Sequence, residues 1–475
     1  MIKPFVNREA ELHSMEKEYG KKEVSLYVLY GRRRLGKTRL IQEFIKNKPS
    51  LYFMASEELE RENLLRFRDK VADFTKNDLL KQVTELTWEM VFQQLIKVKV
   101  ENRPVIVIDE FQYLGKSNKG FPSIFQRIWD EELQHENLMV ILCGSLITMM
   151  ESQVLNYSSP LYGRRTAQWK LKPIEFKHYG QFFQNNMNEI DSLMHYAVTG
   201  GVPKYIEIFQ REENIWDSIR ENIVNRGSYL LEEPIFLLEK EVSEIGSYLS
   251  IMKTIAHGYH KLGEISAALN VKPQGLSKYL SILADLDLIR RQVPITEENP
   301  AKSKKGLYDI NDHFIKFWLR FIYPYREEIE TDQTDPVMKH IRDRLMEKHV
   351  AFVYEEVCRQ KVLEQSHLNN QPFRILKIGR WWNRQEEIDI VGINEESGDI
   401  LFGECKFTNK PVGIALYQDL LRKAQSVQWH QDKRREYFVL FSKSGFTDGM
   451  LSLAENNPQL ILWQGLGIEA TATGA

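Results

Sequence analysis

The residues best suited to chemistry begin with a loop bounded by two glycines, Gly31-x-x-x-x-Gly36-Lys37-Thr38. An apolar run of strand length precedes this loop and an apparent helix follows it, which is the setting of a phosphate-binding loop. The glycines let backbone amides turn towards phosphates, Lys37 reaches the terminal phosphates, and the Thr38 hydroxyl binds Mg²⁺. The pattern therefore predicts a nucleotide site that uses magnesium.

A second apolar strand ends in two carboxylates, Asp109 and Glu110. Beside a nucleotide, Asp109 would hold magnesium through water and Glu110 would polarise the attacking water. An apolar strand with this ending is by itself more often a solvated strand end, but the preceding phosphate-binding loop favours hydrolysis. A third strand, 138–144, ends at Ser145, which we expect between the other two strands and beside the γ-phosphate. Alternatively, Ser145 caps the helix that follows it.

Two adjacent arginines, Arg164 and Arg165, lie on a loop before another expected strand, Ala167 to Leu171. An arginine that reaches the nucleotide, from the same subunit or from a neighbouring one, would neutralise charge in the transition state of hydrolysis. The second case requires a homo-oligomer. Alternatively, the arginines form a surface pair with carboxylate partners, and their spacing does not decide between these interpretations.

The middle of the chain has the pattern of a winged helix-turn-helix. Residues 247–290 show apolar periodicity for three helices separated by turns. Residues 288–294 and 306–310 then predict two strands around a loop rich in lysine. If the module binds DNA, the start of its third helix would approach the groove and the loop would contact phosphate. These candidate DNA-binding residues are Gln274, Ser277, Lys278, Lys302, Lys304 and Lys305. Alternatively, the module only packs against other domains.

A second set of chemical residues lies near the C-terminus, on two expected strands joined by a turn at Glu395 to Gly398. The first strand carries Asp389, and the second carries Glu404 and Lys406. Residues two apart on a strand face the same side, so Glu404 and Lys406 point together. Two carboxylates can hold magnesium, and the lysine can generate or place the hydroxide that attacks a phosphodiester. On an exposed strand, however, Glu-x-Lys is usually a cross-strand ion pair.

Length and composition limit what these motifs can belong to. The chain has 475 residues, which predicts three or four folded units at roughly 100 to 200 residues each. Lys and Arg number 64 against 66 Asp and Glu, so nucleic-acid binding would need a local basic patch. The three cysteines have no zinc-ligand spacing. We expect a cytoplasmic protein without a membrane partner, because no signal peptide or spanning apolar run is present.

Several segments of the first half together resemble the archaeal-type ATPases of the AAA+/STAND group. These segments are Phe5–Leu12, Gly31–Thr38, Asp109–Gln112, Leu161–Arg165 and Thr199–Tyr205. The resemblance implies ATP as the nucleotide, a parallel-sheet P-loop core and a helical lid. It also places Arg8 near the adenine and Pro203 in contact with the nucleotide. Asn7 stands where that family usually has glycine, so we expect a different local backbone there.

The C-terminal pattern resembles the PD-(D/E)xK restriction-endonuclease-like fold over residues from about 340 to the end. The resemblance implies Asp389 and Glu404 as metal ligands and Lys406 as the lysine of the motif. It implies Glu355, on an expected helix at 350–361, as a further acidic ligand, with Glu356 as the alternative. Archaeal-type ATPases often carry such a domain.

The whole chain is therefore expected to be a multidomain α/β protein. Its predicted parts are an ATPase core at 1–172, a helical lid at 173–238, a winged helix at 239–330 and a nuclease-like domain at 331–475, with a linker at Glu327 to Pro336. The first functional hypothesis is an ATPase that acts on DNA and whose nucleotide state controls a magnesium-dependent endonuclease domain. The alternative is a nucleotide-driven signalling switch or DNA-binding regulator without nuclease activity.

Overall fold

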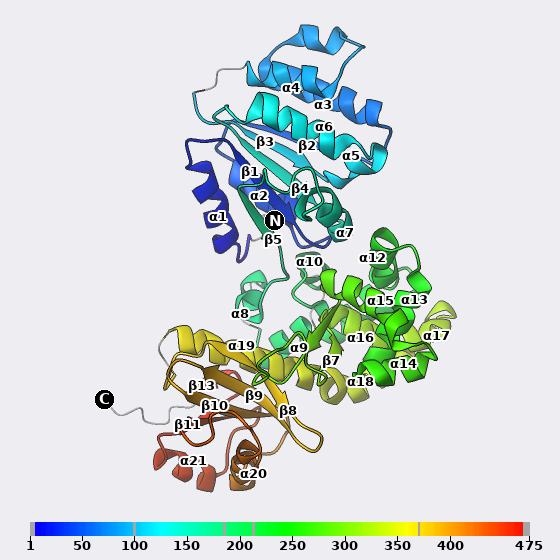
Figure 1. Ribbon diagram of the computed structural model, residues 1–475. Helices are drawn as coiled ribbons and strands as arrows, with labels where there is room; N and C mark the ends of the chain where they lie inside the picture. The colour runs from blue at the N-terminus through cyan, green and yellow to red at the C-terminus, as the bar shows by residue number, and fades with distance from the viewer. Residues whose placement is uncertain (1–4, 98–100, 184–186, 211–213, 369–370, 469–475) are drawn as a thin grey trace. The chain divides into compact units, whose positions relative to one another are not determined.

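The computed structural model describes residues 5–97, 101–183, 187–210, 214–368 and 371–468 (Figure 1). The described chain forms two compact units. Unit 1 comprises residues within 1–182, 201–207 and 235–245, and unit 2 comprises the others. The finer division into four domains stays a prediction.

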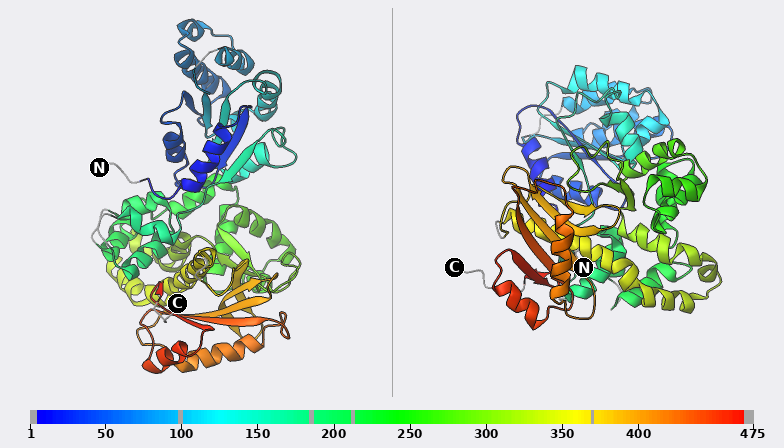
Figure 2. Two further views of the ribbon diagram at one scale, coloured as in Figure 1. Left: turned by 90° about the vertical axis from the view of Figure 1, so that its left-hand side faces the viewer. Right: turned by 60° about the horizontal axis from the view of Figure 1, so that its bottom comes forward.

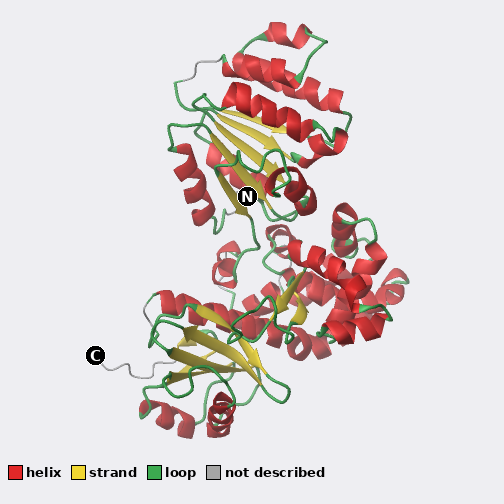
Figure 3. Ribbon diagram, viewed as in Figure 1, coloured by secondary structure: helices red, strands yellow, loops and turns green. Residues whose placement is uncertain are grey.

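Unit 1 is built on one parallel sheet with the strand order β2-β3-β4-β1-β5. Helices cover both faces of this sheet (Figure 3), which explains why its central strands are apolar throughout rather than alternating. The predicted parallel-sheet core is therefore confirmed, with β4 between β1 and β3 as expected. The strands are β1 (Ser25–Tyr30), β2 (Ser50–Met54), β3 (Val105–Asp109), β4 (Met139–Gly144) and β5 (Ala167–Lys170).

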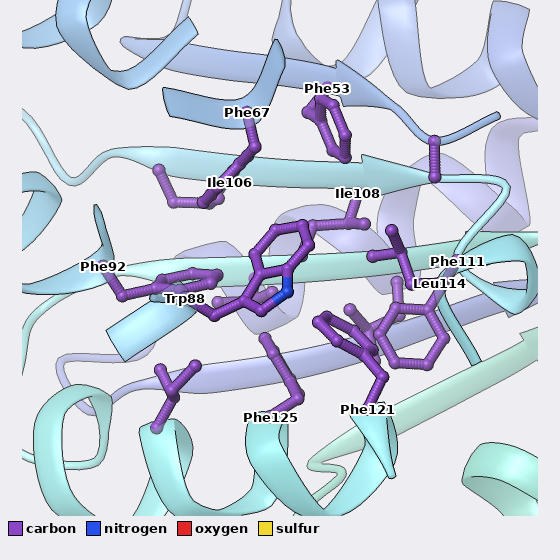
Figure 4. Close-up of a cluster of buried hydrophobic side chains, with 14 of the residues drawn as sticks. Phe53, Phe67, Trp88, Phe92, Ile106, Ile108, Phe111, Leu114, Phe121 and Phe125 are labelled. Carbon is purple, nitrogen blue, oxygen red and sulfur yellow. The ribbon is translucent and has the colours of Figure 1, made fainter. Parts of the chain in front are cut away.

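Aromatic side chains fill the core on one face of this sheet, where Trp88 of α4 and Phe121 of α6 meet with ring centroids 4.9 Å apart (Figure 4). This packing places α4 and α6 against the buried side chains of β3 and β4 that belong to the same cluster. The helices wholly or largely in unit 1 are α1 (Glu9–Tyr19), α2 (Lys37–Ile45), α3 (Glu60–Thr75), α4 (Trp88–Ile96), α5 (Gln112–Ser117), α6 (Phe121–Ile128), α7 (Ile147–Met150), α8 (Phe176–Tyr179), α10 (Pro203–Phe209) and α12 (Glu233–Glu241).

The first part of unit 2 contains three consecutive helices followed by an antiparallel pair of strands, at the positions that the sequence predicts. The predicted linker at Glu327 to Pro336 is wrong, because residues 327–330 lie in α17, residues 334–336 lie in α18, and the whole stretch is inside unit 2. Pro336 is tolerated in the first turn of α18, where its missing N–H would have no helical partner. The elements are α9 (Glu189–Thr199), α11 (Ile215–Ile219), α13 (Ile245–Ala256), α14 (Leu262–Leu269), α15 (Pro273–Asp285), β6 (Ile289–Gln292), β7 (Leu307–Ile310), α16 (His313–Phe321), α17 (Arg326–Glu330) and α18 (Thr334–Leu345).

The last part of unit 2 is a six-stranded sheet with the order β13-β12-β11-β10-β9-β8. Figures 1 and 2 show α19 on one face of this sheet and α20 and α21 on the other. The elements are α19 (Ala351–His367), β8 (Lys377–Trp382), β9 (Glu387–Asn394), β10 (Asp399–Lys406), α20 (Ile414–Gln425), β11 (Arg435–Ser442), α21 (Asp448–Glu455), β12 (Leu460–Gln464) and β13 (Gly467–Ile468).

Short helical segments extend several of these elements: η1 (Asp78–Gln82), η2 (Trp129–Leu133), η3 (Glu151–Leu155), η4 (Gly180–Phe182), η5 (Arg220–Val224), η6 (Tyr323–Tyr325) and η7 (Met346–Val350). Cys143, Cys358 and Cys405 are free thiols and are buried. Among the described residues, no helix is both long and apolar enough to cross a bilayer.

Candidate functional site

The phosphate-binding loop connects β1 to α2 and needs glycine at both of its ends. Gly31 has a φ of 146°, and a Cβ there would lie 2.6 Å from the carbonyl oxygen of Leu171. Gly36 has a φ of 90° immediately before α2 begins at Lys37. Both positions therefore exclude ordinary side chains, and the first turn of α2 is left facing the loop.

Lys37 is folded back onto this loop and is buried. Its Nζ donates to the carbonyl oxygens of Gly31 and Arg32 at 2.7 and 2.9 Å. Burial lowers the pKa of Lys37, although the carboxylates of Asp109 and Glu110 oppose that shift. An anionic phosphate in the loop would add the negative charge that this ammonium needs.

Asp109, at the end of β3, joins the loop to the second strand of the site. Its side chain accepts hydrogen bonds at Oδ2 from the Thr38 hydroxyl, at 3.0 Å, and from the Tyr52 hydroxyl. Asp109 and Thr38 supply the hard oxygen ligands that Mg²⁺ prefers, so they fit this cation. The described residues contain no cluster of three or more His, Cys, Asp or Glu arranged to hold a metal. Magnesium commonly uses one or two protein oxygens together with nucleotide phosphates.

Tyr52 is a site residue that the sequence did not single out. It lies on β2 opposite Val107 of β3, and from there its hydroxyl reaches Asp109. Burial and the charge of Asp109 raise the pKa of Tyr52, so the phenol stays a hydrogen-bond donor. Nothing in its local sequence marks it, because only the pairing of β2 with β3 brings it to the site.

We expect Tyr52→Phe to raise the KM for Mg·ATP about tenfold, since a hydrogen bond to a charged group is worth roughly 1.5 to 3 kcal/mol. The maximal rate should fall less, because the Tyr52 hydroxyl contacts the residues expected to hold magnesium, Asp109 and Thr38. Steady-state hydrolysis across a magnesium titration measures both. Tyr27→Phe is the matched control, because Tyr27 on β1 donates to Ser14 at 3.1 Å and not to Asp109. Unchanged magnesium dependence in Tyr52→Phe would refute a positioning role.

Glu110, the candidate residue for activating water, is held by two neutral side chains. The Ser145 hydroxyl donates to its Oε2 at 2.7 Å, and the Gln112 amide donates to the same oxygen. Glu110 itself has a φ of 55°, a strained conformation of the kind found at functional sites. The Ser145 hydroxyl thus donates to Glu110. The backbone N–H groups of Ile147 and Thr148, at the start of α7, donate to the Glu241 carboxylate and not to Ser145, and the Ile147 distance is 3.1 Å.

Arg8 and Pro203, the two residues carried over from the family resemblance, both lie in unit 1. Arg8 is buried, pairs with Glu11 at 2.9 Å, and donates to the carbonyl oxygen of Leu35 in the loop at 3.2 Å. Pro203 begins α10. Asn7 has a φ of 46°, so it adopts the left-handed conformation that glycine favours. Asparagine can therefore replace the usual glycine here without a change of backbone conformation, so the difference that we expected at Asn7 does not follow from the substitution.

The two arginines after η3 have partners within unit 1. Arg164 forms a two-pronged pair with Asp130, with its Nη2 2.8 Å from Oδ2. Arg165 donates to the carbonyl oxygen of Leu155 at 2.7 Å and lies over the ring of Tyr162. In the described part of the chain, these contacts join both side chains to the loop region around them and to Asp130, and the Asp130 pair is the kind that the surface-pair interpretation predicts for Arg164.

In unit 2 the second set of carboxylates meets where β9 and β10 pair. Gly403 is opposite Ile390, which puts Asp389 beside Glu404. Asp389 Oδ2 accepts from the Cys405 amide at 3.0 Å, and Glu404 Oε2 lies 3.5 Å from Lys406 Nζ. Glu404 is only 2% exposed. Burial, followed by the nearby charge of Asp389, raises the pKa of Glu404.

The structure distinguishes the two glutamates of α19. Burial and the charge of Asp389 raise the pKa of Glu355, which places Glu355 near the β9 carboxylate. Glu356 instead pairs with Arg290 of β6 at 2.6 Å. Burial alone would raise the pKa of Glu356, but Arg290 and His313 hold it at about 2. Glu355 is therefore the better metal-ligand candidate. Asp389, Glu404 and Glu355 carry the oxygen donors that a divalent cation binds, and two lysines already offset the charge of Glu404.

The candidate DNA-binding side chains are exposed. On α15 the buried residues Leu276, Leu280 and Leu283 face the core, whereas Gln274, Ser277 and Lys278 face outwards. Lys302, Lys304 and Lys305 are exposed between β6 and β7, and Lys305 pairs with Glu297 at 2.6 Å. These six side chains are therefore accessible to solvent.

The sheet, the phosphate-binding loop and the Asp109–Glu110 pair make unit 1 a P-loop ATPase. A family described as an "ATPase domain predominantly from Archaea" matches residues 5–209, and one described as "Archaea bacterial proteins of unknown function" matches residues 318–423. The chain is 36% identical over 444 residues to the uncharacterized protein MJECL04 of Methanocaldococcus jannaschii, covering 92% of this chain and 95% of that protein. The chain therefore belongs to the same family as that protein.

Two further comparisons are with an ATP-binding protein and an ATPase. The chain is 50% identical over 44 residues to the uncharacterized ATP-binding protein MJ0423 of Methanocaldococcus jannaschii, 9% of this chain and 75% of that protein. The Walker-type ATPase PABY2304 of Pyrococcus abyssi has a similar fold, with a TM-score of 0.53 at 21% identity, over 66% of this chain and 96% of that one. The prediction of an archaeal-type P-loop ATPase is thus confirmed.

Proposed function

We propose that this ATPase acts on DNA and that its nucleotide state controls a magnesium-dependent, nuclease-like C-terminal domain. The observation that carries the proposal is the register of β9 and β10, in which Ile390 lies opposite Gly403, so that Asp389 and Glu404 follow at adjacent positions and Lys406 lies on the same side as Glu404. The charge of Asp389 also raises the pKa of Glu355 on α19. Two or three carboxylates beside a lysine suit a cation that binds a phosphodiester and a base that activates water. When bound, the cation would supply charge stabilisation for the attacked phosphate.

The DNA-contacting part of the proposal is a winged helix formed by α13, α14, α15, β6 and β7. Its support is the separation of apolar and polar residues on α15 and the exposed lysines at 302, 304 and 305. Lysines on a loop between two strands can contact phosphates whatever the base sequence, and the α15 side chains would lie in a groove. The protein's net charge of -2 makes such a local basic patch necessary.

Two sets of contacts support a link between nucleotide and nuclease. In unit 1, Glu241 of α12 accepts hydrogen bonds from Ile147 and Thr148, just after Ser145, and the chain runs from α12 into α13. In unit 2, Arg290 of β6 pairs with Glu356, the neighbour of Glu355 on α19. A change at Ser145 can thus reach α13 along the chain, and a change at β6 can reach α19 through one ion pair.

A second candidate function is a nucleotide-driven switch or DNA-binding regulator whose C-terminal domain does not cleave. One observation favours it: Glu404 pairs with lysines at both of its oxygens, at 2.8 and 3.5 Å, so its negative charge is already compensated within the domain. Under this alternative the carboxylates and lysines serve only stability or binding.

Cleavage of end-labelled linear, single-stranded and branched DNA in magnesium, with and without ATP, tests the proposal. We expect scission by the wild type, loss of scission in Glu404→Ala and in Lys406→Ala, and altered scission in Lys37→Ala or when ATP is omitted. Lys377→Ala, which removes an exposed lysine paired with Glu395, should cleave like the wild type. ATP hydrolysis without scission of any substrate would instead establish the switch.

A further inference from the structure

Glu404 is held by a second lysine that no sequence motif contains. Its Oε1 lies 2.8 Å from Nζ of Lys423 on α20, while its Oε2 lies 3.5 Å from Lys406. Lys423 also approaches Asp419 Oδ2, one helical turn earlier, at 3.3 Å. Lys423 therefore bridges a carboxylate of its own helix and a carboxylate of the candidate metal site.

The packing of α20 explains why Lys423 reaches this carboxylate. Tyr417, Leu420 and Ala424 are buried against the side of the sheet that carries Phe402. Glu404 is two residues beyond Phe402 on β10 and so faces the same helix. The Lys423 side chain is only 16% exposed, compared with 40% for Lys406. Its contact with Glu404 is thus part of the domain interior and not a loose surface pair.

This ammonium lies 2.8 Å from one carboxylate oxygen of Glu404, a residue that the proposed function assigns to a divalent cation. A positive charge so close to the carboxylate repels an incoming cation, and the low exposure of both side chains strengthens the repulsion. Lysine has a flexible stem and binds phosphate well as a compact charge. A phosphate of bound nucleic acid therefore offers Lys423 an alternative partner, whereas water alone offers a weaker one.

We propose that Lys423 is a positioning residue that couples metal binding to substrate binding at this site. Without nucleic acid, its ammonium holds Glu404 and opposes the cation. When a phosphodiester binds, the ammonium turns to the phosphate and Glu404 becomes available to the cation. The inference rests on the proposed function, because it requires Asp389 and Glu404 to bind a divalent cation.

The test measures Mn²⁺ binding to the full-length protein by the electron paramagnetic resonance signal of free Mn²⁺, without nucleotide. Glu404→Gln identifies the share of binding that belongs to this site. We expect Lys423→Met to bind Mn²⁺ about tenfold more tightly than the wild type, because one nearby positive charge is removed. Adding a short DNA duplex should tighten Mn²⁺ binding in the wild type by a similar factor and change it little in Lys423→Met, after subtraction of Mn²⁺ bound by DNA alone.

Two further variants separate charge at this position from general effects. Lys423→Arg keeps the charge and should behave like the wild type, and Lys377→Met removes an exposed lysine of the same domain and should also leave Mn²⁺ binding unchanged. If Lys423→Met binds Mn²⁺ like the wild type while Glu404→Gln loses the site, the inference is overturned and the metal site stands. If Glu404→Gln binds Mn²⁺ like the wild type, both the inference and the proposed metal site fail.

Discussion

Glu110→Gln should abolish most ATP hydrolysis while leaving ATP binding close to that of the wild type. The amide keeps the shape of the side chain and can still contact Ser145, but it cannot take a proton from water. Loss of a general base typically costs a hundredfold to ten-thousandfold in rate, and we expect a loss of roughly that size in kcat. Single-turnover hydrolysis and equilibrium binding of a fluorescent ATP analogue would separate the two effects.

Lys37→Ala provides the contrast, because Lys37 is the side chain that we expect to meet the terminal phosphates. Its removal should weaken nucleotide binding as well as hydrolysis, whereas Glu110→Gln weakens hydrolysis alone. Equal loss of binding in both variants would mean that Glu110 contributes to nucleotide affinity or to folding, and that the division of roles between Glu110 and Lys37 is incorrect.

The sequence predicted those parts of the sites that depend on contiguous residues. The phosphate-binding loop and the Asp109–Glu110 pair each combine a strand, a turn and a few side chains, so local pattern contains the needed information. The same holds for Glu404 and Lys406, which share a side because strand geometry has a period of two. The parallel sheet of unit 1 was predictable for the same reason, because its apolar strands lead directly into the phosphate-binding loop and the Asp109–Glu110 pair.

The missed residues come from elements that only tertiary packing brings close. Tyr52 reaches Asp109 because β2 pairs with β3. Lys423 reaches Glu404 because α20 covers one side of β10. No spacing in the sequence encodes these contacts. The choice between Glu355 and Glu356 also required the structure, since Arg290 lies far from both in sequence.

The pair formed by Arg290 and Glu356 leads to the second large effect that we expect. Arg290 Nη2 lies 2.6 Å from Glu356 and 3.9 Å from Asp309, and Lys316 lies 2.9 Å from Asp309. These four partly or largely buried charges join β6, β7 and α16 to α19. Removing one partner of a buried pair costs about 3 to 5 kcal/mol, because the remaining charge is left without compensation.

Arg290→Met should therefore lower the free energy of opening of α19 by about 3 kcal/mol. Hydrogen exchange of α19 amides would then be roughly a hundredfold faster, since each 1.4 kcal/mol changes an equilibrium tenfold. Amides of α2 in unit 1 serve as the internal control and should be unchanged. The double variant Arg290→Met/Glu356→Met should recover most of the loss, because it leaves no unpaired charge at this position.

The effect of pH on this pair has a definite sign. Glu356 has a pKa of about 2, below its ordinary value of 4.5, and it faces Arg290, His313 and Arg359. A lowered pKa stabilises the folded state above pH 4.5, and this stabilisation is lost as the pH falls towards 2. In Arg290→Met, less positive charge opposes the effect of burial, so the pKa of Glu356 rises. The ionised Glu356 carboxylate then destabilises the folded state most at neutral pH. The difference in α19 protection between the wild type and Arg290→Met should consequently shrink on acidification towards pH 2. A difference that stays constant from neutral pH down to about pH 2 would show that lost packing, and not the charge of Glu356, causes it.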